Sequence, residues 1–170
     1  MPPAVPESRP VVGVVMGSDS DFTVMSDAVQ VLADFGVPCE VQVVSAHRTP
    51  EKMIAYGKSA RERGLKVVIA GAGGAAHLPG MLASVTTLPV IGVPVPLSRL
   101  DGLDTLQSNV QMPAGIPVAT VSIGGAKNAA LIAVSILSTA DDALADALDR
   151  YRDELSALVE QKNSDLQARL

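Results

Sequence analysis

Aromatic residues are almost missing from this chain of 170 residues: it has no tryptophan, and phenylalanine and tyrosine together make up 2% of it. Hydrophobic residues nevertheless account for 48% of the sequence, so the core must be built from valine, isoleucine, leucine, alanine and methionine. Such a core suits β-strands that are covered on both faces by helices. A chain of this length is expected to form one domain with a substantial core.

Disulfide bonds within the chain are excluded, because Cys39 is its single cysteine. Its place in an apolar segment favours a buried structural thiol, and the lack of disulfides fits a reducing, cytoplasmic compartment. No window holds about 18 consecutive apolar residues, so no membrane-spanning helix is expected. The formal net charge of −5 argues against a nucleic-acid partner, although a small anionic ligand needs only a local positive potential.

From residue 11 onward, β-branched apolar runs alternate with segments of helical periodicity. Each run stops abruptly at glycine, proline or small polar residues, which is typical of buried parallel strands. The alternation predicts an α/β fold with a parallel sheet, helices on both faces and right-handed crossovers. Thr49 is predicted to cap the second helix, and Pro94 to end the fourth strand. The predicted strands are 11–16, 40–45, 65–70, 89–93 and 118–123, and the predicted helices are 20–35, 50–63, 79–85, 104–111, 126–138 and 141–166.

Three parts of the chain differ in character. Residues 1–10 contain four prolines and no apolar run typical of a signal peptide, so a mobile tail is expected there. Residues 11–140 are predicted to form the α/β catalytic domain. Residues 141–170 carry dense charge and an apolar helical stripe, and a helix of roughly 25 residues spans about 37 Å. The stripe must be covered by its own domain or by another subunit, and we favour a neighbouring subunit.

Polar residues follow three of the predicted strands, and both histidines of the chain lie among them. These segments are Gly17–Asp21, Ser45–Pro50 and Gly71–Pro79. Because ligands bind outside the carboxyl ends of parallel strands, we expect the three segments to form one site. The alternative is that His47 and His77 are ordinary turn residues, but the surrounding glycines would let backbone approach a ligand closely.

The segment Gly17–Asp21 is neither a P-loop nor a dinucleotide-binding motif, since it lacks the Lys-Ser/Thr pair and the glycine spacing. Its hydroxyls and helix-start N–H groups can still hold one phosphate, with Arg48 as a bidentate partner. The acids Asp19 and Asp21 would repel phosphate, so they either face a sugar hydroxyl or an arginine, or cap the helix. No metal site is predicted, because neither histidine has cysteine or paired carboxylates at ligand spacing. No serine-hydrolase elbow is present.

These features predict an α/β enzyme that acts on a small phosphorylated metabolite. His47 is its candidate general acid and base, because imidazole exchanges protons near neutral pH.

Several longer motifs carry a resemblance to a known family. They are GSDSD at 17–21, SAHRTP at 45–50, AGAGGAAHLPGM at 70–81, PVIGVPV at 89–95 and VQMPAGIPVATVSIGGAKNAALIA at 110–133. In this order they resemble the class I N5-carboxyaminoimidazole ribonucleotide mutases of purine biosynthesis. The resemblance implies a flavodoxin-like three-layer α/β/α sandwich that assembles as a homo-octamer. It also implies carboxylate transfer from N5 to C4 of the aminoimidazole ribonucleotide, without a metal, biotin or nucleotide cofactor.

The resemblance also implies roles for individual residues. His47 matches the family's catalytic histidine, and Ser18, Asp21 and Arg48 match its substrate-binding residues. The imidazole and carbon dioxide are expected near Ala75, Ala76 and His77. Lys127 is left out of the site, because residues 123–128 are about two residues shorter than a common form of the family. The further residues expected to line the pocket are Gly17, Asp19, Ser20, Ser45, Ala46, Gly73, Gly74 and Leu78.

Three other functions remain open from the sequence. A class II enzyme would carboxylate aminoimidazole ribonucleotide directly with carbon dioxide. A flavodoxin-like module would sense a nucleotide phosphate without turnover. A carrier or scaffold would use the long C-terminal helix.

Overall fold

The computed structural model describes residues 9–170, so most of the tail predicted at 1–10 lies outside the described residues. The strands are β1 (Val12–Met16), β2 (Cys39–Val43), β3 (Val67–Gly73), β4 (Val90–Val95) and β5 (Ala119–Thr120). The helices are α1 (Phe22–Asp34), α2 (Pro50–Ala60), α3 (Leu78–Val85), α4 (Leu103–Val110), α5 (Ala126–Ser138) and α6 (Asp142–Gln167), with short 3₁₀ turns η1 (Asp19–Asp21) and η2 (Leu100–Gly102).

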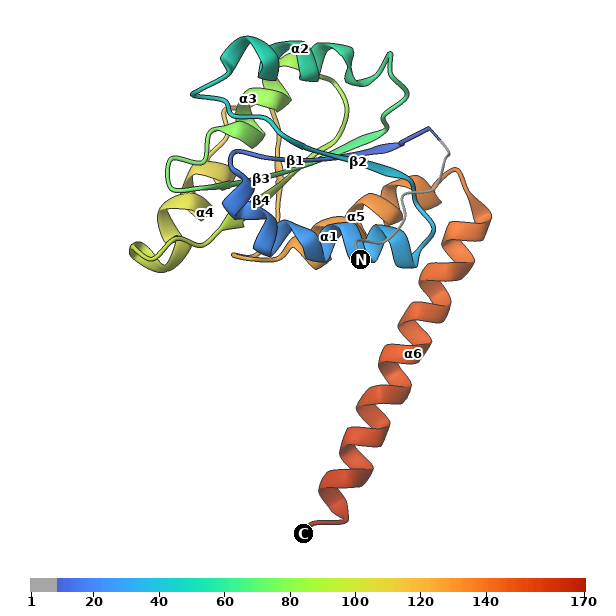
Figure 1. The fold of residues 1–170 in the computed structure, drawn as a ribbon. Helices are drawn as coiled ribbons and strands as arrows, with labels where there is room; N and C mark the ends of the chain where they lie inside the picture. Colours follow the sequence, from blue (N-terminus) through green and yellow to red (C-terminus); the bar gives the residue numbers. More distant parts are fainter. Residues whose placement is uncertain (1–8) are drawn as a thin grey trace. The chain divides into compact units, whose positions relative to one another are not determined.

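The five strands form one parallel sheet in the order β2-β1-β3-β4-β5. Figure 1 shows α2 and α3 on one face of this sheet and α1 and α5 on the other. The predicted flavodoxin-like α/β sandwich is therefore confirmed. In this strand order the chain reverses direction across the sheet between β1 and β3, which is where such folds bind ligands.

Aliphatic side chains fill both layers between sheet and helices, as the composition predicts. Every residue of β1 is buried, and so are the first six of β3. Met25, Ala28 and Leu32 of α1 are fully buried on one side of the sheet. Met53 and Ala60 of α2 join the cluster on the other side. Each large aliphatic side chain buried in this way stabilises the fold by about 1.5–3 kcal/mol.

One local prediction is wrong, and a second is confirmed in position only. Strand β4 does not end at Pro94 but continues through it to Val95, where Pro94 pairs with Ala72 of β3. Proline is tolerated because β5 stops opposite Gly92, so no strand follows there on that side. Thr49 is the N-cap residue of α2, as predicted, but its side chain makes no capping hydrogen bond. Its hydroxyl instead donates a hydrogen bond to the carbonyl oxygen of Ser45.

The chain divides into two compact units, with the boundary in the sequence between Ala133 and Val134. In the second unit, Asp141 caps α6 by accepting hydrogen bonds from the backbone N–H groups of Ala143 and Leu144. None of the residues of α6 is buried, and Leu158 and Val159 are 50% and 61% exposed. The predicted boundary at residue 140, and the packing of this helix on another subunit, remain predictions.

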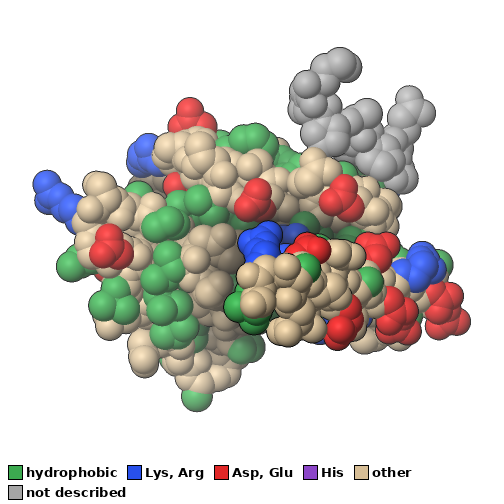
Figure 2. Space-filling view, turned by 90° about the horizontal axis from the view of Figure 1, so that it is seen from below, with side chains coloured by type: hydrophobic (Ala, Val, Ile, Leu, Met, Phe, Trp, Pro, Cys, Tyr) green, Lys and Arg blue, Asp and Glu red, His purple; other side chains and the backbone are tan. Residues whose placement is uncertain are grey.

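The surface of the molecule mixes apolar and acidic side chains, as Figure 2 shows for the face seen from below. Among residues 9–170, no helix combines the length and apolar character that a membrane span requires.

Candidate active site

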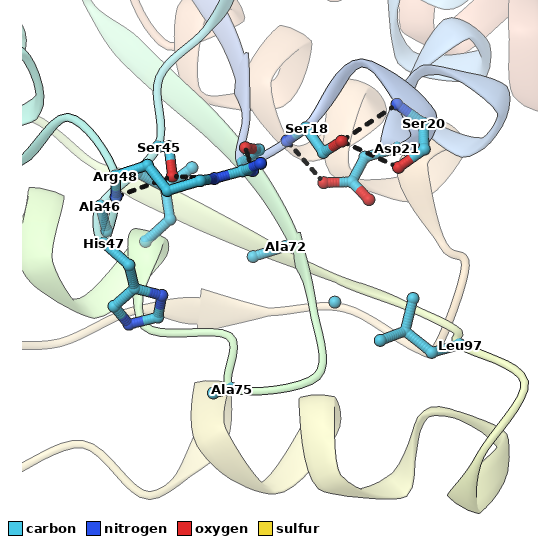
Figure 3. Close-up of a pocket in the computed structure, with 13 residues that line it drawn as sticks. Ser18, Ser20, Asp21, Ser45, Ala46, His47, Arg48, Ala72, Ala75 and Leu97 are labelled. Atoms are coloured by element: carbon cyan, nitrogen blue, oxygen red, sulfur yellow. Dashed lines mark hydrogen bonds between the residues drawn. The ribbon is translucent and has the colours of Figure 1, made fainter.

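A pocket of about 230 Å³ lies at the carboxyl ends of β1, β2 and β3. All three predicted segments contribute to it, so the topology brings them together as the strand pattern predicts. Figure 3 shows Ser18, Ser20 and Asp21 on one side, Ser45, Arg48 and His47 on another, and Leu97 far from His47. The lining residues are Gly17, Ser18, Ser20, Asp21, Ser45, Ala46, His47, Arg48, Ala72, Gly73, Ala75, Leu78 and Leu97.

The turn after β1 is held by a capping box between Ser18 and Asp21. The Ser18 backbone N–H donates to Asp21 Oδ2 at 3.1 Å. The Ser18 hydroxyl accepts hydrogen bonds from the Ser20 hydroxyl at 3.0 Å and from the Ser20 backbone N–H. The turn therefore presents two serine hydroxyls at the end of a buried strand, and hydroxyl groups can donate hydrogen bonds to an anion.

Asp21 is the buried charge of the pocket, with 6% of its surface exposed. Burial raises the pKa of its carboxyl, while hydrogen bonds from the Ser18 and Gly17 backbone and the charge of Arg48 act in the opposite direction. Its Oδ2 atom accepts the Ser18 N–H, and a carboxylate has further lone pairs that can accept a hydrogen bond from a ligand hydroxyl.

Arg48 is fixed by three hydrogen bonds, one to the end of β1 and two within the loop after β2. Its Nη2 donates to the Gly17 carbonyl oxygen at 2.7 Å, and its Nε and backbone N–H each donate to Ser45 Oγ at 3.2 Å. The guanidinium Nη1 makes no hydrogen bond within residues 9–170. A positioned guanidinium with a free donor group suits a phosphate oxygen.

The end of β3 and the turn after it form the opposite wall, through Ala72, Gly73 and Ala75. Gly74 has φ of +62°, a left-handed conformation that favours glycine, and its N–H donates to Thr105 Oγ1 at 2.9 Å. A Cβ atom on Gly73 would lie 2.9 Å from Leu97 Cδ2. The lack of a side chain at Gly73 therefore lets Leu97 close this part of the pocket.

The two histidines meet at the edge of the pocket. His47 Nε2 and His77 Nδ1 are 2.7 Å apart, and the two rings stand edge to face at 83°. His47 lines the pocket, whereas His77, the residue before α3, is exposed and does not line it.

Four of the predicted site residues do not line the pocket. Asp19 is exposed and accepts hydrogen bonds from Ser18 and Ser20. Gly74 turns toward Thr105, Ala76 is buried in the core, and His77 contacts His47. Sequence reasoning missed Ala72 and Leu97; Ala72 could have been found as a small residue near the end of the third strand, but nothing in the sequence marks Leu97. Within residues 9–170, no three His, Cys, Asp or Glu side chains gather closely enough to hold a metal ion.

The fold and the site define a flavodoxin-like α/β protein with a polar pocket at the switch point of its sheet. The AIR carboxylase family model matches residues 11–157. This protein therefore belongs to the AIR carboxylase family, which confirms the resemblance in the sequence.

Named relatives are similar over almost the whole chain. The N5-carboxyaminoimidazole ribonucleotide mutase of Mycobacterium tuberculosis is 64% identical over 94% of this chain and 91% of its own length. The relative of the same name from Aquifex aeolicus is 66% identical over 83% of this chain and 84% of its own. Among solved structures, Treponema denticola PurE superposes with a TM-score of 0.84 and 31% identity, covering 93% of this chain and 99% of that one.

Proposed function

We propose that this protein is an N5-carboxyaminoimidazole ribonucleotide mutase, which moves a carboxylate from N5 to C4 of the aminoimidazole ribonucleotide in purine biosynthesis. The observation that carries the proposal is the 64% identity with a relative of that name across 94% of the chain. The pocket adds chemical support, because it combines an anion-binding turn, an arginine and a histidine.

The ribonucleotide is held by groups at the ends of β1 and β2. The Ser18 hydroxyl and Arg48 Nη1 bind the phosphate. The Asp21 carboxylate accepts a hydrogen bond from a ribose hydroxyl, so its negative charge does not oppose the phosphate. These contacts lie away from the reacting atoms and supply binding energy that holds the substrate in place for the reaction.

His47 moves one proton in each direction during the reaction. It gives a proton to N5 as the N5–carboxylate bond breaks, which releases carbon dioxide and leaves a neutral amine. C4 then attacks the carbon dioxide, and His47 takes the proton that C4 loses, so the histidine returns to its starting state. Ala72, Gly73 and Ala75 have small side chains or none, so this wall leaves room to hold carbon dioxide beside C4. The attack of C4 on carbon dioxide then takes place between two groups held in the same pocket.

The C-terminal helix serves assembly in this proposal. The exposed apolar residues of α6, among them Leu155, Leu158 and Val159, pack on neighbouring copies in a homo-octamer that works in the cytoplasm. Removing residues 141–170 is expected to yield smaller assemblies, measured by light scattering on a sizing column. A truncated chain that keeps the assembly of the full chain would contradict this role.

Purified full-length protein given the N5-carboxylated substrate tests the function. Rapid formation of the C4-carboxylated product without added carbon dioxide is expected. Turnover of aminoimidazole ribonucleotide with carbon dioxide, but not of the N5-carboxylated substrate, would instead identify a direct carboxylase. Binding without turnover of either compound would identify a sensor.

The variant His47→Asn tests the role of the histidine. It is expected to bind the product ribonucleotide with unchanged affinity, since the phosphate contacts remain, while turnover falls by about 10²–10⁴-fold. Calorimetry gives the affinity and an absorbance assay gives the rate. Unchanged turnover would remove His47 from the mechanism.

A further inference from the structure

The two histidines of the chain form a pair, although they are 30 residues apart in sequence. His47 follows β2 and His77 precedes α3, and their facing nitrogens are 2.7 Å apart. The backbone of His77 is held on both sides, because its N–H donates to the Ala75 carbonyl oxygen and its own carbonyl oxygen accepts from Met81. The ring of His77 is therefore presented to His47 from a fixed point.

This contact assigns different tasks to the two nitrogens of His47. Its Nε2 is occupied by His77, so Nδ1 is the nitrogen left for the pocket. Figure 3 shows the His47 ring with one nitrogen turned toward the side of the pocket where Ala72 lies. Any proton exchanged with a ligand in this pocket thus passes through His47 Nδ1.

The proton count of the pair decides which ring donates. A protonated imidazole carries a hydrogen on both nitrogens, so a protonated His47 must donate from Nε2. A hydrogen on His77 Nδ1 would then face that N–H across 2.7 Å, with no lone pair between them. Only a neutral His77 with its lone pair on Nδ1 can remain bonded to His47 both before and after His47 takes up a proton.

We propose that His77 is a positioning residue, whose Nδ1 accepts a hydrogen bond from His47 Nε2–H and so keeps the lone pair of His47 Nδ1 directed into the pocket. The proposal rests on the proposed function of His47 as a proton carrier. It replaces the role in holding imidazole and carbon dioxide that the sequence resemblance gives to His77.

The chemistry of the surroundings explains why a second imidazole stands in this place. Within residues 9–170, neither ring is hydrogen bonded to a carboxylate. Asp21 is bonded to Ser18, and the adjacent Arg48 is bonded to Gly17 and Ser45. A carboxylate partner would stabilise the imidazolium by its charge and hold the proton on His47. A neutral imidazole orients His47 equally well, yet lets it release the proton, as a shuttle requires.

The tautomer of His47 can be observed directly, because the untagged chain has two histidines only. In protein labelled with ¹⁵N-histidine, two-bond ¹H–¹⁵N spectra assign the hydrogen of each neutral ring. We expect His47 with its hydrogen on Nε2 and His77 with its hydrogen also on Nε2. A hydrogen on His47 Nδ1, or on His77 Nδ1, would overturn the proposal whether or not the protein is a mutase.

Three substitutions separate positioning from structure. The amide oxygen of Asn lies near the position of Nδ1, whereas that of Gln lies near Nε2, so His77→Asn keeps the acceptor and His77→Gln displaces it. His77→Leu removes it. We expect His77→Leu and His77→Gln to lose the His47 tautomer and to lower kcat by about 10–100-fold with KM unchanged, while His77→Asn restores both.

Each other outcome counts against the proposal. A raised KM with unchanged kcat in the His77→Leu and His77→Gln variants would show that His77 binds substrate and does not position His47. Equal activity of the Asn and Gln variants would make the ring a structural element only. If His77→Leu fails to fold, as judged by circular dichroism, the comparison of Asn with Gln still decides. Wild-type protein without turnover would refute the proposed function and leave the spectra as the test of the pair.

Discussion

Arg48 Nη2 donates a hydrogen bond to the carbonyl oxygen of Gly17 at 2.7 Å, which ties the loop after β2 to the end of β1. The same side chain is bonded to Ser45, so its position depends on both strand ends. The position of the guanidinium that is proposed to bind the phosphate is therefore set by the pairing of β1 and β2.

The variant Arg48→Lys tests this link. Lysine has one ammonium group and cannot contact Gly17, Ser45 and a phosphate together. We expect KM for the ribonucleotide to rise about 10-fold, with a smaller change in kcat, because the loss of one charge-assisted contact weakens binding by about 1.5 kcal/mol. The matched control is Arg61→Lys, since Arg61 is bonded to Thr87 outside the pocket. Equal KM values for the two variants would contradict the assignment of Arg48.

The buried carboxyl of Asp21 makes stability depend on pH. Its pKa is raised in the folded protein, with burial as the largest cause. A raised pKa means that the folded state holds this proton more tightly than the unfolded state, so the stabilising contribution is present at low pH and is lost as the pH rises through the folded pKa. The variant Asp21→Asn has no titrating carboxyl at this position, so it does not lose stability in this way as the pH rises.

The unfolding free energy of Asp21→Asn minus that of wild type is therefore expected to increase from pH 4 to pH 7. The substitution is also expected to weaken substrate binding, because the carboxylate that accepts the ribose hydroxyl is gone. Urea titrations across this range provide the measurement. The control is Asp27→Asn, which changes an exposed carboxyl of α1. If the difference in unfolding free energy between Asp21→Asn and wild type stays constant with pH, burial does not raise the pKa of the Asp21 carboxyl.

The sequence predicts the sheet and the place of the site because both depend on local patterns. Runs such as Val67–Ala70 favour buried strands because they are short and rich in β-branched residues, and the small residues that follow them mark the strand ends. Parallel pairing then brings Gly17 and Ser45 to the same edge of the sheet. The main features of fold and pocket therefore need no information beyond hydrophobic pattern and turn chemistry.

The remaining details depend on contacts between distant segments. Leu97 reaches the pocket because Gly73 lacks a side chain, and neither residue indicates this alone. The continuation of β4 through Pro94 depends on the early end of β5. The contact of His77 with His47 depends on the path of two separate loops. No periodicity encodes these relationships.

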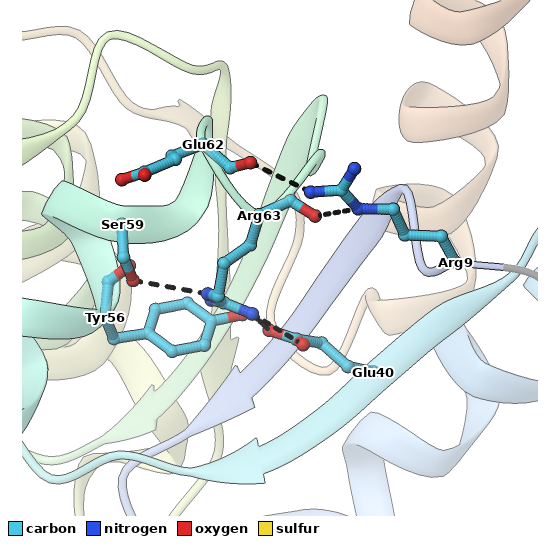
Figure 4. A network of polar contacts seen from close by, with 6 residues as sticks. All are labelled: Arg9, Glu40, Tyr56, Ser59, Glu62 and Arg63. Carbon is cyan, nitrogen blue, oxygen red and sulfur yellow. Dashed lines mark hydrogen bonds and ion pairs between the residues drawn. The ribbon is translucent and has the colours of Figure 1, made fainter.

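An ion pair at the other end of the sheet stabilises the fold. Arg63 Nη1 contacts both carboxylate oxygens of Glu40, at 2.7 and 2.8 Å, and the guanidinium stacks on the Tyr56 ring at 4.8 Å. Figure 4 shows this pair beside Arg9, which is bonded to the carbonyl oxygens of Glu62 and Arg63. The side chains of Arg63 and Glu40 are 35% and 17% exposed.

Because Glu40 is partly buried, Arg63→Met leaves its charge without a partner. We expect a loss of about 1–3 kcal/mol in unfolding free energy, between the values for surface and buried pairs. Adding Glu40→Gln is expected to recover part of this loss, since the unpaired charge is then gone. The control is Arg152→Met, an exposed position of α6. Equal stability of Arg63→Met and wild type would show that solvent screens this pair.

Gly13 and Tyr56 form a tight contact that gives the last prediction. A Cβ atom at Gly13 would overlap the Tyr56 hydroxyl, and it would lie 3.4 Å from Tyr56 Cζ. Both residues are buried, so neither can move aside freely. Gly13→Ala is expected to cost about 1–3 kcal/mol, because overpacking a core displaces its neighbours.

The double variant Gly13→Ala with Tyr56→Phe distinguishes this overlap from other effects of the added methyl group. Removing the hydroxyl opens the space that the new Cβ needs, so the double variant is expected to be more stable than Gly13→Ala alone, with a coupling energy of about 1 kcal/mol or more. Urea unfolding of the two single variants and the double variant measures this coupling. Additive losses would mean that the Leu65 side chain, 3.2 Å from the same Cβ position, is the obstacle instead.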